Sequence, residues 1–228
     1  MLLARVRTVV FDAVGTLIYP DPPAAVVYAE VGARFDCRLS VEEIGRRFRD
    51  AFRREEEADC QHQLRTSEER ERQRWRDIVG RVLDSASRPD ACFEELFEHF
   101  SKPGSWRCAP ETGEVLAALA SRGVTAAMAS NYDRRLRPVI AGIPYLQMLH
   151  PLIISSEVGW RKPAPAFFAQ LIQMIQQPPD RILYVGDDVK NDVEGARAAG
   201  LRAVLFDPSR RAPEVDPRIG RLSELVEL

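Results

Sequence analysis

Hydrophobic and polar residues follow two different patterns in two parts of this chain. Between residues 24 and 100, apolar residues recur at helical spacing among many charged ones, and no run typical of a β-strand interrupts them. After residue 110, short apolar runs alternate with segments of helical periodicity. The first pattern predicts an all-helical module, and the second predicts a parallel sheet with helices on both faces.

The helical part contains a capping-box pattern and two long charged runs. Ser40 with Glu43 is typical of a helix start. The runs Arg53–Glu57 and Glu68–Arg74 mix charges of both signs, which predicts solvated helix faces with i,i+4 ion pairs. The predicted helices are Ala24–Phe35, Val41–Glu57, Ser67–Leu83 and Ala91–Phe100.

The second part is expected to alternate strictly between strand and helix. Its C-terminal segment, Arg221–Leu228, is expected to pack at the sheet edge. The predicted strands are Val124–Ser130, Leu152–Ile154, Ile182–Val185 and Ala203–Phe206, and the predicted helices are Glu111–Arg122, Arg134–Ile140, Pro165–Gln176 and Asp192–Ala199.

A β-branched and aromatic run near the start of the chain, Thr8–Phe11, predicts a further buried parallel strand that ends at Asp12. Gly15 lets the backbone turn sharply and approach a ligand. Ligands of open α/β sheets bind at the carboxyl ends of strands, so Asp12 is a candidate nucleophile, metal ligand or both. The alternative is a carboxylate that only caps the following turn.

The helical module therefore interrupts an α/β core. We predict a core of residues 1–17 and 106–228 and a module of residues 18–105. The Pro-rich segment Tyr19–Pro23 and the segment Lys102–Trp106 are expected to break regular structure, with Pro20–Pro23 and Lys102–Ser105 as candidate hinges.

Composition and charge exclude several classes of partner. The 228 residues are 45% apolar and 29% charged, with a net charge of −2, so no global field favours nucleic acid or an anionic membrane. Arg5 and Arg7 interrupt the first apolar run, which suits neither a signal peptide nor a membrane span and predicts a cytoplasmic protein. The four cysteines lack CxxC spacing and indicate neither a zinc site nor a disulfide framework. Nothing in the pattern predicts an oligomeric state.

The polar residues of the second part fall where predicted strands finish. Parallel strands share a direction, so these ends lie at the same edge of the sheet as Asp12 and can converge on one small anion. They are Ser130 and Asn131 after one strand, Lys162 in the loop after the next, and Asp187 and Asp192 after the strand that ends at Val185.

This set of groups suits phosphoryl transfer to a carboxylate. Such a reaction uses an attacking carboxylate, an oxygen-ligated Mg²⁺, hydroxyl and N–H donors for the phosphate oxygens, and a lysine. Asp12, Asp187 and Asp192 packed together would repel one another, which favours a bound cation. Alone, Lys162 would be interpreted as a surface lysine and Ser130 as a strand-end cap, so the hypothesis depends on their joint arrangement.

Four motifs in this order resemble the haloacid dehalogenase-like (HAD) hydrolase superfamily. They are Asp12–Thr16, Ser130 with Asn131, Arg161–Pro163, and Gly186–Asp192. The helical insert resembles the type-1 cap of that family, and the resemblance spans essentially the whole chain. It implies an α/β, Rossmann-like, doubly wound parallel sheet core with an inserted all-helical cap domain.

The resemblance also implies Mg²⁺ as the cofactor, a small phosphorylated molecule as the substrate, and Asp12 as a nucleophile that forms an aspartyl intermediate. The other implied roles are metal ligation by the Val14 backbone carbonyl, by Asp12 and Asp187, and by Asp192 directly or through water. Ser130, Asn131 and Thr16 would bind the substrate, and Lys162 would orient Asp12.

One position departs from the family pattern. Family phosphatases usually carry an Asp two residues after the nucleophile as general acid and base, and this chain has Val14 there. Loss of such a group typically lowers the rate about 10²- to 10⁴-fold.

Three hypotheses follow from Val14. The protein is a phosphohydrolase whose leaving group needs no protonation or whose acid comes from the cap, a catalytically impaired binding protein, or a 2-haloacid dehalogenase-type hydrolase. Asp187 and Asp192 count against the dehalogenase, since those relatives do not keep the full acidic fourth motif. Phosphonatase chemistry needs a cap lysine, and no Lys occurs between Met1 and Ser101.

Overall fold

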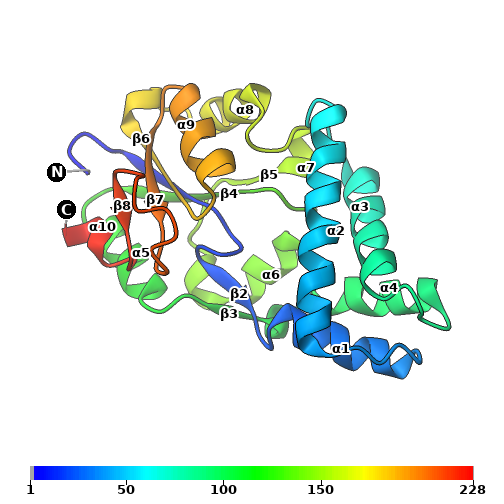
Figure 1. The fold of residues 1–228 in the computed structure, drawn as a ribbon. Coiled ribbons are helices and arrows are strands. Elements are labelled where there is room, and N and C mark those ends of the chain that lie inside the picture. Colours follow the sequence, from blue (N-terminus) through cyan, green and yellow to red (C-terminus); the bar gives the residue numbers. More distant parts are fainter. Residues whose placement is uncertain (1–2, 228) are drawn as a thin grey trace.

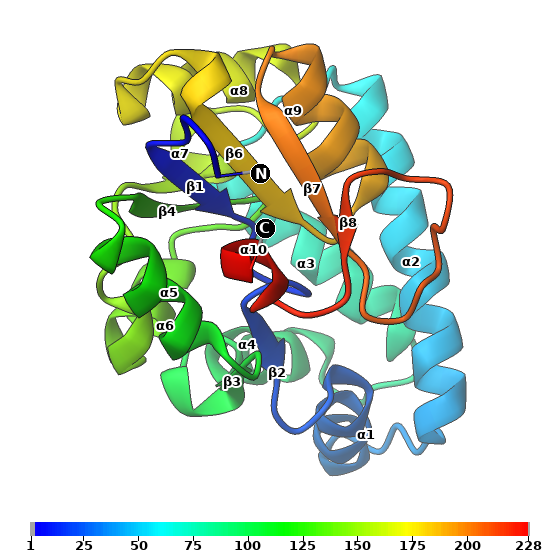
Figure 2. The same ribbon diagram turned by 90° about the vertical axis from the view of Figure 1, so that its left-hand side faces the viewer.

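Six parallel strands form the centre of the protein in the computed structural model, which describes residues 3–227. The strand order is β5-β4-β1-β6-β7-β8, with β1 between β4 and β6. Helices cover both faces of the sheet (Figure 2), so the predicted α/β class is confirmed. The strands are β1 (Thr8–Phe11), β4 (Thr125–Ser130), β5 (Leu152–Ile154), β6 (Ile182–Gly186), β7 (Arg202–Phe206) and β8 (Arg218–Ile219).

Strand β1 shows why the sequence of this sheet is continuously apolar. Val9 and Phe11 face one side, where they join a hydrophobic cluster with residues of α5 (Thr112–Ser121) and α6 (Leu136–Gly142). Val10 faces the other side and joins residues of α8 (Pro165–Ile175) and α9 (Gly195–Ala198). Both faces are buried, so alternation of polar and apolar residues is lost.

Four helices lie together beside the sheet (Figure 1) and have a hydrophobic cluster of their own, which includes Tyr28, Ile44, Ile78 and Phe93. The four predicted helices of this module are confirmed, with ends that differ by up to four residues. The Ser40 side chain accepts a hydrogen bond from the Glu43 amide at 3.2 Å, as the capping pattern predicts. The helices are α1 (Ala24–Arg34), α2 (Val41–Gln61), α3 (Glu68–Val82) and α4 (Pro89–His99).

The expectation of irregular structure at both ends of the module is wrong in part. Residues Ile18–Pro20 form strand β2, which pairs antiparallel with β3 (Trp106–Cys108). Pro20 is tolerated there because a two-stranded ribbon is all edge and leaves strand N–H groups unpaired in any case. Both connections to the module therefore run through one small ribbon.

The prediction that the charged runs are solvated is wrong for their inward-facing residues. Glu55, Glu71 and Arg74 are each at most 4% exposed. Arg70 lies 2.9 Å from Glu55, and Arg74 lies 2.9 Å from Asp59, which is also buried. These ion pairs join α2 to α3, so α2 continues to Gln61 beyond its predicted end.

The helix predicted from Asp192 begins earlier, as a π-helical turn η4 (Val189–Glu194) that leads into α9. The Asp188 side chain accepts a hydrogen bond from the Asn191 amide at 2.8 Å and caps this turn. At the C-terminus, Leu225 of α10 (Glu224–Glu227) is buried in the cluster that contains α5, while β8 forms the sheet edge; Leu228 lies outside the described residues. The remaining short helices are α7 (Ser155–Val158), η1 (Pro103–Ser105), η2 (Pro144–Leu146) and η3 (Pro179–Arg181).

Within residues 3–227, no helix has both the length and the apolar character needed to cross a bilayer.

Candidate active site

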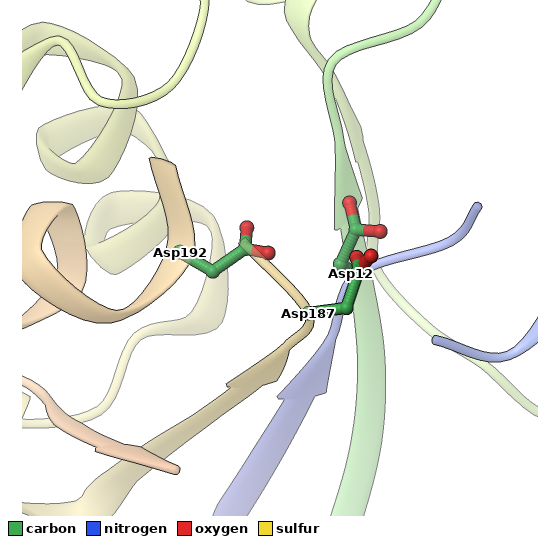
Figure 3. A group of neighbouring side chains, drawn as sticks. All are labelled: Asp12, Asp187 and Asp192. Atoms are coloured by element: carbon green, nitrogen blue, oxygen red, sulfur yellow. The ribbon is translucent and has the colours of Figure 1, made fainter. Parts of the chain in front are cut away.

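Three carboxylates meet at the carboxyl end of the sheet. Asp12 follows β1, Asp187 follows the neighbouring strand β6, and Asp192 lies in η4. One oxygen of each lies within 4.8 Å of the other two, and Figure 3 shows Asp192 pointing toward the Asp12 and Asp187 pair. The topology thus brings together three residues that are separated by up to 180 positions in the chain.

Two glycines allow this close approach. Gly15 has a φ of +98°, and a Cβ on it would lie 2.5 Å from the Asp187 Oδ2 atom. A Cβ on Gly186 would overlap the Asp192 carboxylate. Any larger residue at either position would displace a site carboxylate.

Lys162 is buried at the centre of the group. Its Nζ atom donates to Oδ1 of Asp12 and to Oδ1 of Asp192, both at 2.6 Å. The Asn131 side chain holds the Lys162 backbone: its Oδ1 atom accepts from the Lys162 amide at 2.7 Å, and its Nδ2 atom donates to the Lys162 carbonyl at 3.0 Å. Asn131 therefore positions the lysine loop through its side chain.

Tyr184 is a site residue that the sequence reasoning missed. It lies in the middle of β6, where its hydroxyl donates to the Ala129 carbonyl at 2.8 Å and accepts from Lys162 Nζ at 2.9 Å. A tyrosine in a buried apolar strand needs a partner for its hydroxyl. Its presence in the apolar run Ile182–Val185 was therefore the sequence signal that could have identified Tyr184 as a site residue.

Burial dominates the electrostatics of the site. It raises the pKa of Asp12 to about 7, with Lys162 opposing the rise and the two other carboxylates adding to it. Burial, together with Asp192, also raises the pKa of Asp187 to about 6. Burial alone would lower the pKa of Lys162, but Asp12 and Asp192 outweigh it and hold that pKa well above its ordinary value.

The residues fit a bound Mg²⁺. Three ionised carboxylates and one ammonium group leave a net charge of minus two, which a divalent cation balances. The available donors are all oxygens, and Mg²⁺ prefers one or two carboxylates with the remaining positions taken by water and substrate phosphate. Within residues 3–227, no hydrogen bond reaches the Oδ2 atom of Asp12, so this oxygen is available to a ligand.

The other predicted site residues lie at the same edge. Ser130 ends β4 and is buried. The Thr16 hydroxyl is buried and lies 3.5 Å from Asp187 Oδ1. Val14 is partly exposed and forms an isolated β-bridge with Ile18, which closes the tight loop after β1. Its side chain is a hydrocarbon and can neither give nor take a proton.

The helical module touches the core beside the site. Arg161, the residue before Lys162, is buried and forms ion pairs with Glu71 and, at 3.3 Å, with Asp59 of the module. The Arg65 guanidinium also lies 4.5 Å from the ring centroid of Trp160. Neither contact was foreseen from the charge pattern.

A family comparison agrees with this geometry. The model of the haloacid dehalogenase-like hydrolase family matches residues 6–200, from before β1 to just before β7. The chain belongs to this family. The predicted resemblance is therefore confirmed, and the four motifs of this HAD-like hydrolase all lie within the matched range.

Individual relatives cover nearly all of this HAD-like hydrolase. The haloacid dehalogenase-like hydrolase domain-containing protein 3 of Bos taurus is 27% identical over 209 residues, which are 88% of this chain and 82% of the relative. The ribulose-1,5-bisphosphate 5-phosphatase of Halopiger xanaduensis is 28% identical over 248 residues and covers 96% of this chain and 98% of the relative. A crystal structure of a dehalogenase matches with a TM-score of 0.78 at 19% identity, over 96% of this chain and 95% of that one, and supports the fold.

Proposed function

We propose that the protein is a Mg²⁺-dependent phosphohydrolase that acts on a small phosphorylated metabolite through an aspartyl-phosphate at Asp12. The observation that carries this proposal is the burial of Asp12 between Lys162 and two further carboxylates. Two relatives that are named as phosphatases support the same reaction class. In this proposal residues 18–105 form a cap over a core of residues 1–17 and 106–228.

The chain's own residues would act in a defined order. Lys162 holds Oδ1 of Asp12 at 2.6 Å and leaves Oδ2 to attack phosphorus. The bond between phosphorus and the leaving oxygen breaks, and its electron pair goes to that oxygen. Water then attacks the phosphorus of the aspartyl-phosphate, which releases phosphate and restores the Asp12 carboxylate. The Ser130 hydroxyl and the backbone N–H of Asn131 would bind the phosphate oxygens during both steps.

Asp12, Asp187, Asp192 and the Val14 carbonyl would hold Mg²⁺. The bound ion would neutralise charge on the phosphate and on the carboxylates.

A direct test uses purified protein with Mg²⁺ on p-nitrophenyl phosphate, acetyl phosphate and a panel of sugar, nucleotide and organic-acid phosphates. We expect turnover that stops with a chelator and in Asp12→Asn. No turnover of any compound, together with no phosphate label on Asp12, would overturn the proposal. Halide release from 2-chloropropionate would instead support the dehalogenase.

Val14 favours a second candidate function, a binding protein that keeps the metal site without turnover. Mg²⁺-dependent binding of a phosphorylated metabolite by a wild-type protein that hydrolyses nothing would be its signature. The Val14→Asp variant separates the cases further, because a scaffold that lost only its proton-transfer group would gain activity from this substitution.

A further inference from the structure

The proposed reaction leaves one proton transfer without a donor. An alkoxide leaving group has to be protonated as its bond to phosphorus breaks. Val14 carries no proton, and the Lys162 ammonium donates to Asp12 and Asp192. The donor must therefore come from another side chain that faces the bound substrate.

A cleft of about 420 Å³ lies between helix α2 of the module and the core. Asn131 and Lys162 line it on the core side, so it reaches two residues of the proposed active site. Its volume suits a small metabolite. The carboxylates that line it are Glu56, Glu57, Asp59 and Asp188.

Two of these carboxylates are occupied. The Asp59 oxygens accept hydrogen bonds from Arg70 and Arg74, both at 2.9 Å, and also contact Arg161. Both oxygens of Asp188 bind Asn191, one through its amide at 2.8 Å and the other through its side chain at 3.1 Å. Neither group is free to reach a leaving oxygen.

Glu56 differs from the others. It is partly buried, whereas Glu57 is exposed, and within residues 3–227 it makes neither a hydrogen bond nor an ion pair. Its neighbours on α2 fix its direction, because Glu55 and Asp59 are both buried and both held by Arg70. Rotation of α2 that moved Glu56 away from the cleft would break these contacts.

The charges around Glu56 suit a proton donor. Burial raises the pKa of its carboxyl above the ordinary value; Arg74 on α3 and Arg161 before Lys162 oppose the rise, as does Lys190 in η4, and Asp188 adds to it. A raised pKa keeps more of the acid form at neutral pH, which is the form that protonates a leaving oxygen.

We propose that Glu56 is the catalytic acid of this enzyme, in place of the proton donor that Val14 cannot supply. This rests on the proposed phosphohydrolase function. As the phosphorus–oxygen bond breaks, its electron pair goes to the leaving oxygen, which takes the Glu56 proton. In the second step the attacking water leaves its proton on the released phosphate, and solvent returns a proton to Glu56 before the next cycle.

The test compares two classes of leaving group in Glu56→Gln. Alkyl phosphates need protonation, whereas p-nitrophenyl phosphate and acetyl phosphate release stabilised anions. We expect kcat on alkyl phosphates to fall about 10²- to 10⁴-fold and kcat on the activated substrates to change little. Wild-type turnover of alkyl phosphates should decline at high pH, where Glu56 loses its proton, and this decline should be absent in Glu56→Gln. Adding Val14→Asp to the Glu56→Gln variant should restore turnover of alkyl phosphates. Retained hydrolysis of p-nitrophenyl phosphate shows that the variant is folded.

The controls separate this inference from the proposed function. Glu57→Gln, one residue away and exposed, should leave the ratio between the two substrate classes unchanged. Wild-type protein that hydrolyses neither class contradicts the phosphohydrolase itself. A different result is an active wild type of which Glu56→Gln and the shortened Glu56→Asp both lower kcat equally on the two substrate classes. That result overturns the role of Glu56 and still supports the phosphohydrolase.

Discussion

Arg161 of the core and Glu71 of the helical module form an ion pair in which each side chain is at most 6% exposed. Arg161 immediately precedes Lys162, whose ammonium contacts the proposed nucleophile. This contact between the module and the core lies one residue away from the lysine that holds the proposed nucleophile. A change in the position of the module would therefore move the loop that carries Arg161 and Lys162.

Glu71→Gln should destabilise the protein strongly. Removing one partner of a buried pair costs about 3–5 kcal/mol, and we expect the lower end because Arg161 keeps Asp59 at 3.3 Å. Glu94→Gln is the matched control, since Glu94 pairs with Arg72 on the half-exposed outer side of the module and its loss should cost less than about 1 kcal/mol. Urea unfolding measures both, and equal costs would contradict the buried pair's importance.

Tyr184→Phe tests how the lysine is held. The variant loses the hydroxyl that contacts Lys162 Nζ at 2.9 Å and leaves the Ala129 carbonyl with one partner fewer. We expect a loss of about 1 kcal/mol in the free energy of unfolding and a less than about tenfold drop in kcat. Lys162→Met should lower kcat by about 10²- to 10³-fold. A Tyr184→Phe variant as inactive as Lys162→Met would show that the hydroxyl takes part in the chemistry.

Gly15→Ala should weaken Mg²⁺ binding. The new Cβ would lie 2.5 Å from Oδ2 of Asp187 and push that carboxylate out of place. Gly123→Ala provides the control, because Gly123 also has a positive φ, +69°, but a Cβ there meets nothing within 4 Å. Calorimetric titration with Mg²⁺ should show reduced affinity for Gly15→Ala alone. Equal affinities in the two variants would contradict Asp187 as a ligand.

The stability of the metal-free protein should depend on pH in a direction set by Asp12 and Asp187. Their pKa values in the folded protein are about 7 and about 6, against 3.8 ordinarily, so between these values the folded state binds more protons than the unfolded state. The free energy of unfolding therefore falls as the pH rises through this window. Thermal unfolding of Asp12→Asn should show a shallower fall than the wild type.

Mg²⁺ should oppose this loss, because it binds the deprotonated carboxylates. At about 100 times its dissociation constant it should add about 2.7 kcal/mol of stability. Its effect on the melting temperature should be larger at about pH 8 than at about pH 5. A Mg²⁺ effect that is independent of pH would contradict a site made of these carboxylates.

The sequence predicted the position of the site because parallel topology requires it. Asp12, Lys162 and Asp187 follow strands that share one direction, so their convergence needs only the strand assignments. Asp192 was expected in the same group because it closely follows the strand that carries Asp187, although it lies in η4 rather than directly at a strand end. Periodicity could not reveal this π-helical turn, because it is set by the side chain of Asp188.

The contacts between core and module could not be read from the sequence. Charged runs look the same whether their residues face water or each other, so Glu71 and Arg74 were placed on a solvated surface. Their burial depends on Asp59 and on Arg161, which lies 90 positions beyond Glu71. Pairings of this range depend on tertiary packing. Strands β2 and β3 were not predicted for a similar reason, since each has only three residues and is stabilised by pairing with the other.

The β2–β3 ribbon has a consequence for how such proteins can diversify. The Asp21 amide donates to the Ser105 carbonyl at 2.9 Å, so the chain leaves the core and returns to it at the same point. Everything from residue 22 to residue 104 could be exchanged for another insert, or for a short hairpin turn, while the two strands stayed paired. The loop after β1, which carries the proposed nucleophile, and the inserted helical module can thus be inherited separately.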